Sequence, residues 1–96
     1  MNQIPDTGTL HILNKAPGHP RFVACLAAMS NQDTLILIEN AVLALPDTDT
    51  VLPRQTLALE PDLEARGLSG TAEPGQQISH QQLVQLTEQH PRIISW

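Results

Sequence analysis

The most constraining feature of this 96-residue chain is a run of four consecutive apolar residues, Leu35-Ile36-Leu37-Ile38, with polar segments on both sides. A strand with one wetted face alternates apolar and polar residues, whereas an unbroken apolar run is typical of a strand covered on both faces. Such strands occur in parallel sheets that have helices on each side. We therefore expect an α/β fold built around this run.

Strand-like and helix-like segments alternate on either side of the run. The predicted strands are 10–13, 35–38, 55–59 and 92–96, with a weak fifth at 77–78. The predicted helices are 21–29, 41–45 (a short helix or a turn), 61–66 and 80–90. Pro20 is well placed to open the first helix, and Gly67 to end the third. Ser79 with Gln82 forms a capping-box pattern before the last helix. The order predicts a mostly parallel sheet of four to five short strands.

Length and composition indicate one small domain. We expect residues 1–9 to be a flexible leader and residues 10–96 to form a single domain. Hydrophobic residues make up 41% of the chain, which is enough for a packed core, but Phe22 and Trp96 are its only aromatic residues. The core must therefore consist mainly of Leu, Ile, Val and Ala.

Charge and hydropathy exclude several classes of function. The net charge is −5 and no cluster of Lys or Arg is present, so we expect no direct binding to nucleic acid. No apolar stretch approaches the roughly 18 residues of a membrane span. Residues 1–9 lack the features of a signal peptide. The single cysteine, Cys25, fits a reducing cytoplasm.

Cys25 is the first candidate for chemistry, with two interpretations. As a thiolate it could accept a sulfane sulfur from a donor persulfide and pass it on, a reaction for which one cysteine suffices. Alternatively, it shares an apolar stripe with Phe22 and Met29, where burial would raise its pKa and make it inert.

Other candidate sites are weaker. The four histidines (His11, His19, His80 and His90) show no metal-ligand spacing, so we expect no metal site. The loop 14–20 after the first strand lies where ligands bind in α/β sheets, but its prolines remove N–H donors, so we expect no cofactor. Lys15 in this loop is a candidate contact for an anionic persulfide or an acidic partner. Trp96 is either an interface anchor or packs on the domain's own core.

Three short motifs carry a resemblance to a known family. They are Leu10-His11-Ile12-Leu13-Asn14-Lys15-Ala16-Pro17, Asp62-Leu63-Glu64-Ala65-Arg66-Gly67-Leu68, and Leu86-Thr87-Glu88-Gln89-His90-Pro91 with the final Trp96. In this order and spacing the chain resembles the TusB/DsrH family of bacterial sulfur-relay subunits from Leu10 to Trp96. The resemblance implies a compact three-layer α/β/α domain of the DsrEFH-like kind. The loop 70–77 departs from the family pattern, which predicts a short or missing strand there.

The resemblance also implies a function. It implies a subunit that assembles with TusC-like and TusD-like (DsrF/DsrE-like) partners in a cytoplasmic complex. This complex passes persulfide sulfur between upstream and downstream carrier proteins for 2-thiolation of the tRNA wobble uridine. The subunit would be accessory rather than catalytic. One alternative is a DsrH-type subunit in sulfur oxidation or trafficking, with Cys25 carrying the persulfide. A further alternative is a standalone homo-oligomeric binding module without sulfur chemistry.

Overall fold

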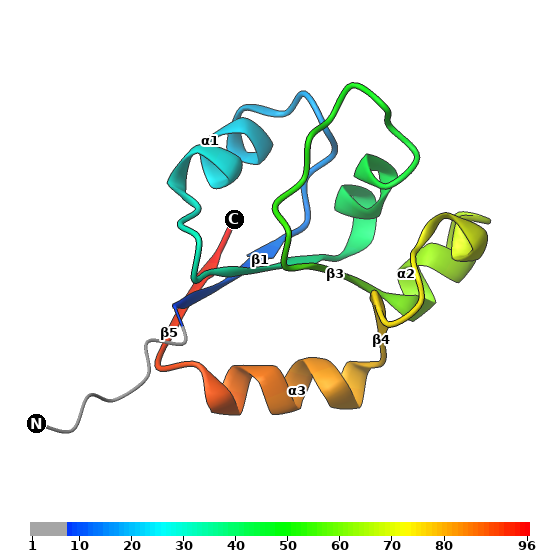
Figure 1. Ribbon diagram of the computed structural model, residues 1–96. Helices are drawn as coiled ribbons and strands as arrows, with labels where there is room; N and C mark the ends of the chain where they lie inside the picture. The colour runs from blue at the N-terminus through cyan, green and yellow to red at the C-terminus, as the bar shows by residue number, and fades with distance from the viewer. Residues whose placement is uncertain (1–7) are drawn as a thin grey trace, which may run out of the picture.

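The computed structural model describes residues 8–96, which form alternating strands and helices (Figure 1). The elements are β1 (Thr9–Leu13), α1 (Pro20–Ala28), β2 (Thr34–Leu37), the 3₁₀ helix η1 (Glu39–Ala44), β3 (Thr56–Leu59), α2 (Glu60–Ala65), the 3₁₀ turn η2 (Ser69–Thr71), β4 (Gln77–Ile78), α3 (His80–Gln89) and β5 (Arg92–Ser95). The weak strand at 77–78 is present and short, whereas η2 was expected as loop. Most of the predicted leader lies outside the described residues, and its last residue, Thr9, opens β1.

All strand pairings in the five-stranded sheet are parallel, and the order is β4-β3-β2-β1-β5. Strands β1 to β4 follow one another across the sheet in sequence order, each beside its predecessor. The chain then returns across the whole sheet through α3 and adds β5 on the free side of β1. The predicted parallel α/β sheet is therefore confirmed.

Two apolar clusters lie on opposite faces of the sheet, and the run 35–38 contributes to both. Leu35 and Leu37 belong to the larger cluster, which includes buried residues of α1, η1 and α2. Ile36 belongs to the smaller cluster, against which Leu83 and Leu86 of α3 pack. Figure 1 shows the same arrangement, with α1 on one side of the sheet and α3 alone on the other. The fold is thus three-layered, and the central strand is covered on both faces as predicted.

Local signals set the ends of two helices. The Ser79 hydroxyl accepts the N–H of Gln82 at 3.1 Å, and the Gln82 side-chain oxygen accepts the N–H of Ser79 at 2.8 Å, which completes the predicted capping box. At the end of α2, Gly67 has a φ of +67°, a conformation that favours glycine. There the N–H of Leu68 bonds to the carbonyl of Leu63 at 2.8 Å, the six-to-one bond of a Schellman motif.

The capping box predicts a measurable contribution to stability. Ser79→Ala removes the acceptor for the Gln82 N–H, and we expect the free energy of unfolding to fall by about 1 kcal/mol. Urea unfolding followed by circular dichroism measures the change. Gln81→Ala, an exposed change on the same helix, is the matched control and should stay within about 0.5 kcal/mol of wild type. Equal effects of the two variants would contradict the capping role.

Candidate functional site

A buried histidine joins three distant parts of the chain. His11 in β1 is 1% exposed. Its Nε2 lies 2.9 Å from Oδ2 of Asp33, which directly precedes β2, and its Nδ1 accepts the indole N–H of Trp96 at 3.0 Å. The two rings are nearly parallel, with centroids 6.0 Å apart. The two sequence motifs at opposite ends of the chain are therefore joined here by a side-chain hydrogen bond.

This arrangement defines the tautomer of His11. The indole nitrogen of Trp96 can only donate, so Nδ1 of His11 must carry a lone pair. The ring proton is then on Nε2, where it is donated to the Asp33 carboxylate. Both ring nitrogens are occupied and the ring is buried. His11 therefore acts as a structural connector and is not available as a base for an external substrate.

Asp33 is the acceptor at the centre of this network. Burial by itself would raise the pKa of its carboxyl group, but hydrogen bonds outweigh burial and hold the pKa well below the ordinary value of 3.8. The bonds come from the main-chain N–H groups of Thr9 and Ser30, from His11 and from the Ser30 hydroxyl. Asp33 is therefore ionised at neutral pH and connects the start of β1 to the loop before β2.

Cys25 lies in the apolar core on the same side of the sheet as Trp96. Its side chain is fully buried, and it shares the larger apolar cluster with Phe22, Leu13 and the partly buried Trp96. Burial raises the pKa of the thiol from 9.0 to about 11. The thiol is therefore protonated at neutral pH in this conformation. The predicted stripe is present, with Phe22 and Cys25 buried and Met29 packed against the cluster.

Lys15 and Trp96, the two interface candidates, lie next to each other. Nζ of Lys15 is 3.3 Å from the main-chain oxygen of Trp96 and also donates to Oδ1 of Asn14. Trp96 thus partly packs on the domain's own core while its main chain stays within reach of Lys15. The remaining histidines have local roles or are exposed. His19 caps α1 by accepting the N–H of Arg21 at 3.0 Å, a role that no sequence pattern indicated.

The motif at residues 62–68, the second of the three that carry the family resemblance, connects the carboxyl ends of β2 and β3. Glu39, directly after β2, has a φ of +49°, which is strained for a residue other than glycine. Its N–H donates to Oδ2 of Asp62 at 2.7 Å, and Arg66 donates to Oδ1 of Asn40 at 3.1 Å. The polar residues of α2 therefore hold the turn after β2.

Two surface hollows lie at the amino ends of the strands, away from the predicted edge. One has a volume of about 470 Å³ and the other about 810 Å³, and both are lined in part by Arg54 and Gln55. Glu73 is the only carboxylate in the first, and the only one in the second is the fully bonded Asp33. Within residues 8–96, no group of three His, Cys, Asp or Glu side chains is placed to hold a metal ion. No described helix is long and apolar enough to cross a membrane.

We predict that breaking the His11–Trp96 hydrogen bond lowers the stability of the protein without changing its fold. Trp96→Phe keeps an aromatic ring but leaves the buried Nδ1 of His11 without a donor, so we expect unfolding to become easier by about 1–2 kcal/mol. Chemical unfolding at neutral pH measures this. Ile93→Val, a conservative change on the exposed strand β5, should cost less than about 0.5 kcal/mol. A Trp96→Phe protein as stable as wild type would show that the bond contributes nothing.

The low pKa of Asp33 predicts acid sensitivity. In the unfolded chain the pKa of Asp33 returns to about 3.9, above its value in the folded protein. The contribution of Asp33 to the free energy of unfolding is therefore complete above about pH 5 and is lost progressively below about pH 4. Asp33→Asn should be less stable than wild type at pH 7 and should lose less further stability between pH 5 and pH 3. Urea unfolding at each pH measures both effects, with the exposed Glu64→Gln as control. Parallel pH profiles for Asp33→Asn and wild type would rule out this role.

Comparison with known proteins gives one consistent result. The model of the family described as DsrH like protein matches residues 15–93. The protein TusB of Escherichia coli K12 is 34% identical over 94 residues, which cover 91% of this chain and 99% of that protein. TusB of Enterobacter sp. strain 638 is 31% identical over the same coverage, and TusB of Pectobacterium parmentieri 29%. The chain therefore belongs to the DsrH-like family, as its three motifs predicted.

Proposed function

We propose that this protein is an accessory subunit of a hetero-oligomeric sulfur-relay complex that passes persulfide sulfur for 2-thiolation of the tRNA wobble uridine. Its partners are TusC-like and TusD-like subunits, and the sulfur comes from and goes to separate carrier proteins in the cytoplasm. Membership of the DsrH-like family and full-length similarity to TusB proteins support this proposal. The net charge of −5 supports a role without direct tRNA binding.

The burial of Cys25 is the observation that favours an accessory role. A persulfide carrier must present a thiolate that attacks the outer sulfur of the donor, with release of the donor's own thiolate. The pKa of the Cys25 thiol is raised to about 11 by burial. At pH 7 only about one molecule in 10⁴ then carries the thiolate. The donor would also have to pass the core side chains that cover it, since Cys25 is fully buried.

A second candidate function keeps Cys25 as a working thiol. Cys25 lies in α1, shortly after the first strand, which is the position that the resemblance to DsrH-type subunits implies for a persulfide-carrying cysteine. In that function, part of α1 would move away from the core during transfer. The two candidates differ in one measurable property, the reactivity of this thiol in the assembled protein.

One experiment tests both the partnership and the chemistry. The full chain is co-expressed with the TusC-like and TusD-like subunits of its own organism, purified through a tag on this chain, and exposed to a low-molecular-weight persulfide. We expect a stable complex, in which intact-mass spectrometry finds no added sulfur on this chain because its thiol is protonated and covered. The same treatment of Cys25→Ser is the control.

The possible outcomes separate the candidates. A gain of about 32 Da, one sulfur atom, on wild type and not on Cys25→Ser would replace the accessory role with the DsrH-type carrier. A chain that purifies alone as a homo-oligomer would contradict both and would support a standalone binding module.

A further inference from the structure

β5 is an edge strand that the rest of the domain leaves uncovered. Among residues 8–96 it pairs only with β1, and all four of its residues are exposed. Ile93 and Ile94 point to opposite faces of the sheet and are each 43% exposed. The N–H of Trp96 bonds to the carbonyl of Ile12, so by alternation the N–H groups of Ile93 and Ser95 point away from β1. The edge thus presents both apolar side chains and main-chain groups that a neighbouring strand could pair with.

The opposite edge of the sheet is protected in ways that β5 is not. β4 is only two residues long, and its Ile78 is buried under α3. A very short edge strand offers little to an incoming chain. β5, by contrast, has no proline or bulge, and its one charged residue, Arg92, lies at its start and leaves Ile93 to Ser95 without the features that discourage strand addition. One edge of the sheet is therefore closed and the other open.

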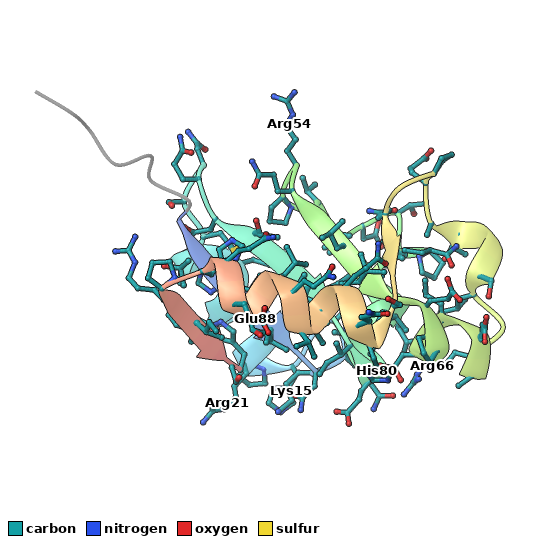
Figure 2. All side chains as sticks on the ribbon, turned by 90° about the horizontal axis from the view of Figure 1, so that it is seen from below. Lys15, Arg21, Arg54, Arg66, His80 and Glu88 are labelled. Atoms are coloured by element: carbon teal, nitrogen blue, oxygen red, sulfur yellow. The ribbon has the colours of Figure 1, made fainter. Side chains whose placement is uncertain are left out.

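Charge is distributed unevenly about this open edge. The segments 8–32 and 89–96, which contain β1, α1 and β5, hold Lys15, Arg21 and Arg92 but no Asp or Glu. Residues 33–88 hold two arginines and nine acidic residues, so the two parts carry formal charges of +3 and −7. In Figure 2, Lys15 and Arg21 lie toward β5, together with Glu88 of α3, and Arg66 lies toward the other end. Lys15 donates to an amide oxygen and a main-chain oxygen near the end of β5.

From this combination we infer that the β5 edge docks an extended segment of a partner subunit, which continues the sheet and carries carboxylates that meet Lys15 and its neighbouring cations. This inference rests on the proposed function, because it requires a partner of another sequence. Main-chain pairing along β5 supplies affinity, and Ile93 and Ile94 supply apolar contacts on the two faces. The cationic surroundings select an acidic partner and speed its approach.

A second copy of this chain fits the edge less well. Nine of its ten acidic residues lie in 33–88, where the only strand edge of the described chain is the two-residue β4. Antiparallel pairing of β5 with itself would bring Lys15 of one copy toward Arg92 of the other, since these residues lie at opposite ends of the strand. A nucleic acid also fits less well, because the centre of the surface is aliphatic and offers no aromatic side chain for base stacking.

The test compares edge variants of the full chain for binding to the co-expressed TusC-like and TusD-like subunits. Ile93→Pro removes an outward N–H while sparing the ladder to β1, and Lys15→Glu reverses the charge beside Trp96. We expect each variant to bind at least tenfold more weakly than wild type. Val51→Lys, at an 87% exposed position outside the cationic segments, is the matched control and should bind like wild type. Urea unfolding of each isolated chain checks that it is folded, and Ile93→Lys replaces Ile93→Pro if the proline variant is not.

The outcomes distinguish this inference from the function on which it depends. If wild type does not bind the partner subunits, the proposed function fails. If wild type binds and the folded edge variants bind equally well, the function stands and the docking surface lies elsewhere. Self-association of wild type that Ile93→Pro abolishes, without partner binding, would make the edge a homo-oligomer contact. Salt-sensitive binding of tRNA to wild type alone, lost in Lys15→Glu, would make it an RNA surface and also overturn the inference.

Discussion

The buried imidazole of His11 is the interaction on which the arrangement of this domain depends. A polar ring can be buried only if its nitrogens are bonded, and the two partners come from positions 22 and 85 residues away in sequence. Asp33 fixes the start of β1 and the loop before β2, while Trp96 fixes the end of the chain. β5 has no buried side chain of its own, so its position depends on pairing with β1 and on Trp96. The open edge is therefore held in place by main-chain pairing and by Trp96, without burial of the side chains of β5.

The path of the chain explains why one face of the sheet is covered less fully by helices than the other. Four strands are added in one direction, and α1, η1 and α2 contribute buried residues to one face. The return through α3 must cover the other face alone, and α3 has no fully buried residue and exposes Val84. The elements added last, α3 and β5, thus contribute least to the core. A small domain of this kind gains from burying such elements against another subunit.

Local patterns in the sequence predicted the helices and strands, whereas contacts between distant residues determine how these elements are arranged. The apolar run 35–38 predicted a doubly covered strand, and the capping box at Ser79 predicted the start of α3, because each signal lies within a few residues. The His11–Trp96 bond, the role of Asp33 and the edge position of β5 join segments far apart in the chain, and no local pattern predicts such pairings. The resemblance identified the motifs around His11 and Trp96 without the reason that they belong together. The stripe with Phe22 and Met29 indicated that Cys25 packs in the core, whereas its part in sulfur transfer stays a prediction.

Burial of the only thiol and exposure of β5 have the same structural origin. α1 covers the larger apolar cluster with Phe22 and Cys25, and this packing makes the layer above β1 compact enough to hold His11 and Trp96. An exposed, reactive Cys25 would require α1 to loosen, which would weaken the layer that supports Trp96 and hence β5. A stable docking edge and a freely reactive thiol are therefore opposing demands on this small domain. The packing observed favours the edge, which is the physical reason that we propose contacts with a partner, and not thiol chemistry, as this protein's contribution.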